Sequence, residues 1–269
     1  MLFLPILLPM KTFTLIVVFC CCLVSASVFA QNSPQAIEGD LLRIFKKVNY
    51  YGAHKKEWKA IDSLQKMNRM FAFKLKYYTT KYPFTITQNF TELIKERLVI
   101  ASSSDGLFRT YSWDTRLGTT GYSFSNVVQY KVKGQTTALL KIDSAGKNAA
   151  PSFWYSKVYT FAANGKTYYL ATFNTIYSAA RAAQGLRIFV IENGKLVTNP
   201  PLIKTPTGVY SQLHYDYNFP SIADWTSFPT INFDKATKTL STPLVDYSGK
   251  MTRKFITYKF NGRFFEKVR

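Results

Sequence analysis

The chain has few acidic residues and, beyond its N-terminal segment, no cysteine. Of its 269 residues, 35 are Lys or Arg and 15 are Asp or Glu, which gives a formal net charge of +20. Cys20, Cys21 and Cys22 are the only cysteines. The rest of the chain can therefore form no disulfide, thiolate metal site or thiol nucleophile. Because secreted eukaryotic domains of this size usually carry disulfides, a bacterial envelope or extracellular setting is favoured.

Other absences exclude further classes of protein. No apolar run of membrane-spanning length follows Ala30, so the sequence predicts no transmembrane span in the mature chain. Neither GxGxxG nor GxxxxGK[ST] occurs, and we expect no nucleotide and no other cofactor. The GxSxG motif of α/β hydrolases is also missing. Hydrophobic residues make up 47% and charged residues 19%, which argues against a disordered chain or a coiled coil.

The N-terminal segment has the features of an export signal. Met10 and Lys11 form a short basic start, residues 12–24 are apolar, and small residues precede a cleavage point after Ala30. We expect residues 1–30 to be a cleaved signal peptide, with Met10 as an alternative start, and the protein to be periplasmic or extracellular. An uncleaved anchor helix is the alternative, since the apolar stretch is nearly continuous from the first residue.

Residues 31–97 carry the pattern of helices. Ser33 before Pro34 is a typical helix start, a break near Gly52 separates two periodic stretches, and the second should end before Pro83. The sequence predicts a basic amphipathic hairpin and a third, short helix at 91–96. The predicted inner faces carry Ile37, Leu41, Ile44, Phe45 and Val48 in the first helix, and Trp58, Ile61, Leu64, Met67, Met70 and Phe71 in the second.

From residue 98 to residue 269 the hydrophobic period changes to two, and three Asn-Gly pairs predict tight hairpins. Two-residue loops would place Phe161 opposite Tyr168, Glu192 opposite Lys195 and Tyr258 opposite Phe265. A fourth hairpin would use a longer loop after Asp234. Further strands are predicted at 107–113, 124–132 and 135–142, with a turn at 143–146.

About a dozen short strands in one region indicate an antiparallel β domain. The predicted fold class is α+β and mainly antiparallel β: an N-terminal helical segment at 31–97, then a curled meander or sandwich at 98–269. A small degenerate β-propeller is the alternative.

The most distinctive stretch contains Arg109, Tyr111, Trp113 and Asp114. In a strand the first three would share one face, which could stack on a sugar ring and bind its hydroxyls. We favour a structural role instead. Trp113 would be buried, because Phe108 and Thr110 form the poorer core face, and Arg109 would pair with a carboxylate, Asp114 being the first candidate.

The motif DGLFRTYSWDT at 105–115, followed by the strand-like NVVQY at 126–130, resembles a group of uncharacterised exported bacterial β-rich proteins. The resemblance covers about residues 98–200. It implies no activity, so no functional residues carry over.

A catalytic alternative depends on His214 and Asp216, which would share one strand face. Such a pair could transfer protons, but no third ligand is visible and no metal site is predicted. A glycan or ester hydrolase would use His214 with Asp216 or Asp114. The structural alternative is a strand histidine packed or solvated among tyrosines.

The charge points to an anionic partner. Removal of Lys11 with the signal leaves 34 basic and 15 acidic residues, a net charge of +19. Outside the cell this excess favours acidic glycans or anionic envelope surfaces over nucleic acid, although solubility alone is an alternative. We therefore expect an exported, non-catalytic protein that binds or scaffolds an envelope component through a basic, aromatic β surface. The sequence gives no indication of the oligomeric state.

Overall fold

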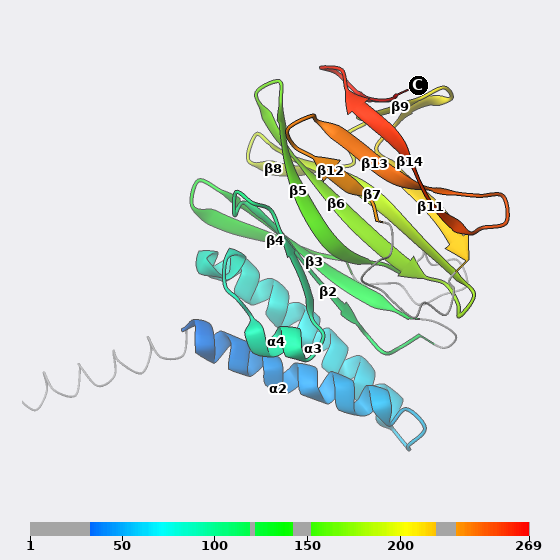
Figure 1. The fold of residues 1–269 in the computed structure, drawn as a ribbon. Coiled ribbons are helices and arrows are strands. Elements are labelled where there is room, and N and C mark those ends of the chain that lie inside the picture. The colour runs from blue at the N-terminus through cyan, green and yellow to red at the C-terminus, as the bar shows by residue number, and fades with distance from the viewer. Residues whose placement is uncertain (1–32, 119–121, 142–151, 219–229, 269) are drawn as a thin grey trace, which may run out of the picture.

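The structure is a computed structural model that describes residues 33–118, 122–141, 152–218 and 230–268. An N-terminal helical pair is followed by strands β1 to β15, so the fold is α+β with antiparallel β dominant, as predicted. Figure 1 shows the helices and three sheets stacked as successive layers. The sheets pack face to face, as in a sandwich with an extra layer. The predicted signal peptide and the turn at 143–146 lie outside the described residues.

The helices begin and end near the positions that the sequence predicts. Helix α2 (Pro34–Ala53) starts with a side-chain cap, because Ser33 Oγ accepts a hydrogen bond from the Ala36 amide at 3.1 Å, and its five predicted core residues are buried. Helix α3 (Ala60–Lys81) ends before the 3-10 turn η1 (Pro83–Ile86), and α4 (Thr91–Lys95) is the short third helix. Among the described residues, no helix is long and apolar enough to cross a membrane.

The inner face predicted for α3 was partly wrong. Leu64 and Phe71 are buried, but Trp58, Ile61 and Met70 are 88%, 51% and 37% exposed. The helix is rotated so that polar Asn68 faces the neighbouring sheet, and its amide donates to the Thr115 carbonyl at 2.8 Å. A buried polar residue with partners in the sheet interrupts the apolar period, so hydrophobicity alone misplaces the inner face.

The strands form three sheets. Sheet A is a meander in the order β1-β2-β3-β4; sheet B has the order β11-β7-β6-β5 with β8 paired to β7; sheet C has the order β10-β9-β15-β14-β13-β12. The pairing of β15 with β9 is parallel. The strand bounds are β1 Val99–Ser102, β2 Phe108–Asp114, β3 Phe124–Val132, β4 Gln135–Lys141, β5 Trp154–Ala163, β6 Lys166–Ile176, β7 Arg181–Glu192, β8 Lys195–Thr198, β9 Ile203–Thr205, β10 Gly208–Tyr210, β11 Gln212–Asn218, β12 Asn232–Asp234, β13 Thr239–Val245, β14 Met251–Phe260 and β15 Phe265–Lys267.

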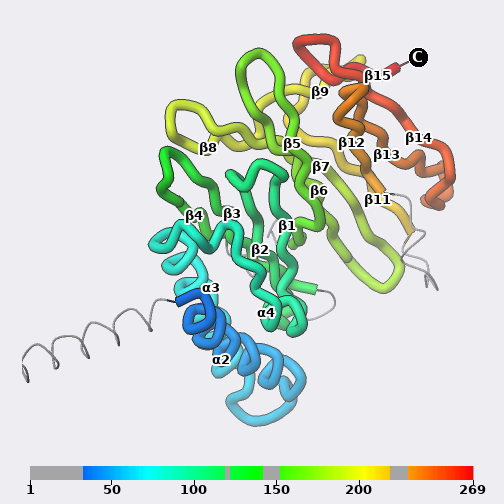
Figure 2. Tube along the Cα trace, turned by 60° about the vertical axis from the view of Figure 1, so that its left-hand side comes forward, coloured from blue at the N-terminus to red at the C-terminus, as the bar shows by residue number. Residues whose placement is uncertain are grey.

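Each interface between layers holds its own apolar core. The helices and sheet A enclose the first, in which the rings of Phe71 and Trp113 are 5.1 Å apart. Sheets A and B enclose the second, where Phe108 stacks on Tyr169 at 4.8 Å. Sheets B and C enclose the third, around Phe161. Strand β2 is thus buried on both faces, and the expectation that Phe108 lies on its poorer core face was wrong. Figure 2 shows the C-terminus at the opposite end of the molecule from α2.

Two of the three Asn-Gly registers are confirmed. Phe161 pairs with Tyr168, and Glu192 pairs with Lys195. In the third hairpin Phe265 pairs with Phe260 instead of Tyr258. The loop there has two extra residues because the Asn261 side chain accepts hydrogen bonds from two following amides, at 3.0 and 2.9 Å. A shift of two residues keeps Phe265 on the same face, inside the third core.

Candidate functional site

The Arg109, Tyr111 and Trp113 side chains share one face of β2, as predicted, and point into the core beneath the helices. They are only 6%, 0% and 0% exposed. Trp113 Nε1 donates to Asn68 Oδ1 of α3 at 3.2 Å. The Tyr111 hydroxyl donates to the Thr85 carbonyl at 2.9 Å, and burial raises the pKa of Tyr111 to about 12. These side chains leave little or no surface for a ligand.

The carboxylate partner predicted for Arg109 was wrong. Its Nη1 donates to the carbonyls of Thr85 and Gln88, at 3.0 and 2.6 Å, and its Nε donates to Ser102 Oγ at 2.7 Å. The guanidinium therefore fastens the segment after α3 to sheet A. Backbone carbonyls replace the expected carboxylate because the chain between Pro83 and Phe90 runs directly over this end of β2.

His214 and Asp216 share one exposed side of the edge strand β11. The Asp216 carboxylate accepts hydrogen bonds from Arg181 at 3.2 Å and from the Tyr177 hydroxyl at 3.4 Å. Within the described part of the chain, no hydrogen bond or ion pair engages the His214 ring. The same residues contain no group of three His, Cys, Asp or Glu side chains that could hold a metal ion.

Asp114 lies elsewhere, in a cleft between α2 and the ends of β2, β3 and β5. The cleft has a volume of about 200 Å³. An adjoining hollow of about 220 Å³ shares Asp114, Arg116 and Tyr122 with it, and the two together are called the depression below. Neither is lined by His214. The structure therefore does not bring Asp114 and His214 together in this cleft.

One wall of the cleft is a row of aromatic rings. The Tyr122 and Phe124 centroids are 6.1 Å apart, and those of Phe124 and Trp154 are 4.8 Å apart. Tyr122 and Phe124 are two residues apart and so lie on the same side of the extended chain that enters β3. The Phe124 amide donates to Ser152 Oγ, which holds the start of β3 beside the start of β5. Tyr122 is 53% exposed and extends the row to the surface.

The cleft also has polar and charged lining residues. Asp114 pairs with Arg116 Nε at 3.5 Å and accepts a hydrogen bond from the Arg116 amide at 2.9 Å. The Arg116 Nε is buried and has no hydrogen-bond partner among the described residues. Arg116 packs so closely on α2 that a Cβ at Gly52 would lie 2.6 Å from its Cβ and Cγ. A residue larger than glycine there would force Arg116 or α2 to shift.

Two more charged residues come from the connection between α4 and β1. Glu96 accepts a hydrogen bond from Asn49 Nδ2 at 3.0 Å and faces Lys46 Nζ at 3.9 Å. Arg97 is exposed at the cleft, and no carboxylate of the described residues pairs with its guanidinium. In the adjoining hollow Lys55 Nζ donates to the Gly118 carbonyl at 3.2 Å. The depression thus combines a stacking wall with cations that could meet an anionic group.

Sequence reasoning found only Asp114 of this cleft. Arg97, Arg116, Tyr122 and Trp154 were missed, because they come from four segments that no spacing connects. The alternation of Tyr122 with Phe124 was a local signal of a shared face, but it could not indicate that Trp154 would extend the row. The sequence matches no model of a known protein family and no curated protein, so the geometry of the cleft is the basis for its assignment.

Proposed function

We propose that the protein is an exported, non-catalytic binding protein that takes an acidic oligosaccharide of the cell envelope into this cleft. The observation that carries the proposal is that the aromatic row of Tyr122, Phe124 and Trp154 lines the same cleft as Arg97 and Arg116. Export rests on the pattern of residues 1–30, and an intact mass that begins at Gln31 would support it.

The aromatic row suits the flat, apolar faces of sugar rings. Rings at centroid spacings of 6.1 and 4.8 Å offer a continuous surface over which C–H groups can pack, as aromatic side chains pack in interfaces. Tyrosine and tryptophan also keep a polar edge for hydrogen bonds. A surface of this length accommodates more than one ring, so an oligosaccharide fits it better than a single sugar.

The cations favour an acidic sugar over a neutral one. A guanidinium binds a carboxylate or phosphate through two parallel hydrogen bonds, and Arg97 has no carboxylate partner among the described residues. Arg116 shares its charge with Asp114. Asp114 can in turn accept hydrogen bonds from sugar hydroxyls, so the cleft offers both kinds of polar contact.

Binding without cleavage is favoured by the state of the two carboxylates in the cleft. Glycosidic cleavage requires a pair of carboxyl groups that face the scissile bond. Glu96 is engaged by Asn49, and Asp114 by Arg116. His214, on which the hydrolase alternative depends, does not line the depression.

Calorimetric titration of residues 31–269 with acidic and neutral oligosaccharides of equal length tests the proposal. Oligogalacturonate, alginate fragments and peptidoglycan fragments are the acidic probes, and a cello-oligosaccharide is the neutral one. We expect an acidic probe to bind. The Trp154→Ala and Tyr122→Ala substitutions should each lower the affinity for this probe roughly tenfold through lost stacking. Arg97→Gln should lower the affinity for the acidic probe and leave that for the neutral probe unchanged.

Tyr247→Ala is the matched control for Tyr122→Ala, because Tyr247 is fully exposed on the turn between β13 and β14. The affinity of the Tyr247→Ala variant for each probe should equal that of the parent protein. Equal affinity of the Trp154→Ala variant and the parent for every probe would refute the proposal. Release of shorter sugars during the titration would replace it with the hydrolase alternative.

A further inference from the structure

A second surface lies on the outward side of the helical pair, where a groove separates α2 from α3. Arg43, Ile44 and Lys47 of α2 and Met67, Met70 and Lys74 of α3 line this groove, which has a volume of about 180 Å³. Its floor is apolar and its rim is cationic. An amphiphile with an apolar part and an anionic head has the matching chemistry.

The apolar surface continues from the groove along α3. Met70, Phe73 and Tyr77 form this surface, and Lys66 lies one turn before Met70. The four residues follow at helical spacing, so their side chains are neighbours. Met70, Phe73 and Tyr77 are 37%, 59% and 54% exposed, whereas the outward side of a helix in a globular protein is usually polar. Arg43, Lys47, Lys66, Met70, Phe73 and Tyr77 are called the outer helical face below.

The helical pair is strongly basic. By sequence α2 and α3 together carry eight Lys or Arg residues and three acidic residues, Glu38, Asp40 and Asp62. The charge of Asp40 is neutralised within the helical pair, because its carboxylate forms ion pairs with Arg43 and Lys74 at 2.6 Å each. Two such faces would repel each other, so a second copy of the chain is a poor occupant, and an anionic surface is a good one.

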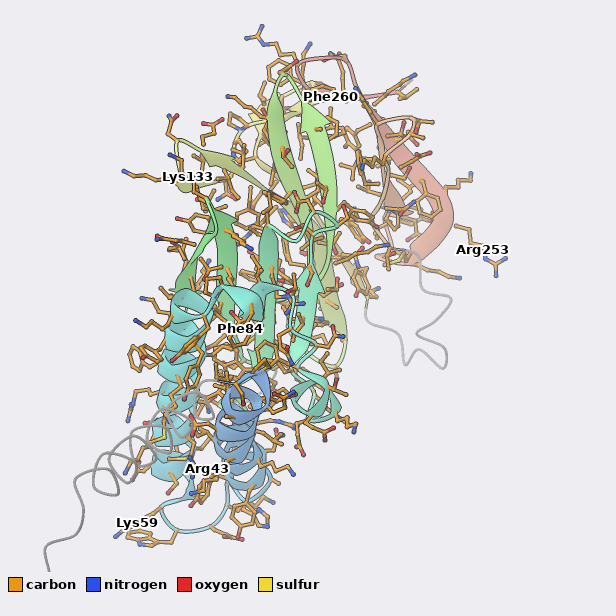
Figure 3. The ribbon with its side chains drawn as sticks, turned by 90° about the vertical axis from the view of Figure 1, so that its left-hand side faces the viewer. Arg43, Lys59, Phe84, Lys133, Arg253 and Phe260 are labelled. Carbon is orange, nitrogen blue, oxygen red and sulfur yellow. The ribbon has the colours of Figure 1, made fainter. Side chains whose placement is uncertain are left out.

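The loop between the two helices adds an interfacial tryptophan. Trp58 is 88% exposed, stands among Lys55, Lys56 and Lys59, and has the Lys59 ammonium 5.9 Å from its ring centroid. Figure 3 shows Lys59 at the end of the helical pair farthest from the sheets, with Arg43 on the same pair. Tryptophan and lysine together are typical of protein segments that contact lipid headgroups.

We propose that the outer helical face binds the surface of an anionic phospholipid bilayer. The cations contact lipid phosphates, and Met70, Phe73 and Tyr77 enter the headgroup region together with Trp58 of the adjacent loop. The acidic-sugar cleft uses Asn49 of α2, and Lys47 points to roughly the opposite side of that helix, because two residues turn the chain by about 200°. The cleft that Asn49 lines therefore faces away from the outer helical face.

Co-sedimentation of residues 31–269 with vesicles tests this proposal independently of any sugar. We expect binding to equimolar phosphatidylcholine and phosphatidylglycerol, little binding to phosphatidylcholine alone, and release by salt. Each cation removed should weaken binding about fivefold, so the Lys47→Gln/Lys66→Gln variant should bind about 25-fold more weakly. Phe73→Ser should weaken binding roughly tenfold through lost apolar insertion.

The matched controls lie on β14 in sheet C. Arg253→Gln/Lys254→Gln removes the same charge, and Phe255→Ser removes a phenylalanine that is 48% exposed. Both should bind like the parent protein. Equal losses in the control and the test variants would overturn the proposal, since net charge alone would then explain binding. A dimer that forms without lipid and is abolished by Phe73→Ser would overturn it in favour of a second copy of the chain.

Discussion

At the scale of single residues, the polar atoms around β2 explain why its sequence is so distinctive. Arg109, Tyr111 and Trp113 each direct a hydrogen-bond donor at the segment from α3 to η1 or just after it: Arg109 binds Gln88, Tyr111 binds Thr85 and Trp113 binds Asn68. Buried donors of this kind are costly when they are left unpaired. The motif therefore fixes the helices on sheet A, and its polar groups bind other residues of the protein rather than a ligand.

The first prediction concerns Trp113, which is fully buried against Phe71. Trp113→Ala should lower the free energy of unfolding by about 3–5 kcal/mol, because it removes a large buried side chain and leaves a cavity. The melting temperature should fall by roughly 6–20 °C. Urea unfolding of the two proteins measures the loss. Trp58→Ala, at a site that is 88% exposed, should leave the stability nearly unchanged, and equal losses at both positions would contradict the structure.

At the scale of elements, Asp40 is the main polar contact between the two long helices. Its carboxylate accepts hydrogen bonds from Lys74 at 2.6 Å, from Tyr78 at 2.8 Å and from Arg43 at 2.6 Å. Burial alone would raise the pKa of Asp40, but these three donors outweigh burial and hold the pKa below 3.8. Burial and the same hydrogen bond raise the pKa of Tyr78 to about 12.

The second prediction concerns the pH dependence of that contact. A pKa lower in the folded than in the unfolded protein means that the ionised carboxylate stabilises the fold. Asp40→Asn should therefore cost about 1–2 kcal/mol at neutral pH. The difference from the parent protein should shrink as the pH falls below about 3.8 and vanish below the lowered pKa.

Urea unfolding from neutral pH to about pH 3 measures this difference. Asp62→Asn is the control, because Asp62 lies exposed on α3, and its effect should stay within about 0.5 kcal/mol. A cost for Asp40→Asn that persists unchanged in acid would contradict the ionic origin of the contact.

The elements themselves were largely predictable, because their signals are local. The Ser33 cap, the α2 core residues and the turns at Asn164 and Asn193 each depend on a few neighbouring residues, and all were predicted correctly. The hairpin at Asn261 was wrong because one amide side chain capped a longer loop. The inner face of α3 was misplaced because polar Asn68 lies on it, held by a hydrogen bond to the Thr115 carbonyl, and so interrupts the hydrophobic period.

The cleft was not predictable for a different reason. Arg97, Arg116 and Trp154 meet only because the helical pair, sheet A and sheet B stack in one order. When a sheet is buried on both sides, the spacing of its strands in the sequence does not indicate which layer packs against each face. The aromatic content and the basic charge indicated a ligand class, whereas the place where aromatic and basic side chains meet is a property of the tertiary structure.

At the scale of the whole molecule, each sheet contact depends on the layer next to it. Tyr111, Trp113, Val127 and Ala138 of sheet A face the helices. Phe108 and Val128 of the same sheet face sheet B, which in turn faces sheet C. A sheet with both faces buried joins the two cores that it separates, so loss of one layer exposes apolar surface on the next. The boundary at residue 97 therefore divides the chain by secondary structure but does not divide its cores.

The last prediction follows from these shared cores. Thermal unfolding of residues 31–269 should be a single transition that coincides when it is followed by tryptophan fluorescence and by far-ultraviolet circular dichroism. Residues 98–269 alone would expose the fully buried Tyr111 and Trp113 rings, so this fragment should aggregate or lose its near-ultraviolet signal. Two separate transitions in the longer chain, or a soluble fragment with native near-ultraviolet circular dichroism, would mean that the sheets fold without the helices. In that case Arg109 and Trp113 would fasten a separate domain, and Trp113→Ala would destabilise only the contact between the helices and sheet A.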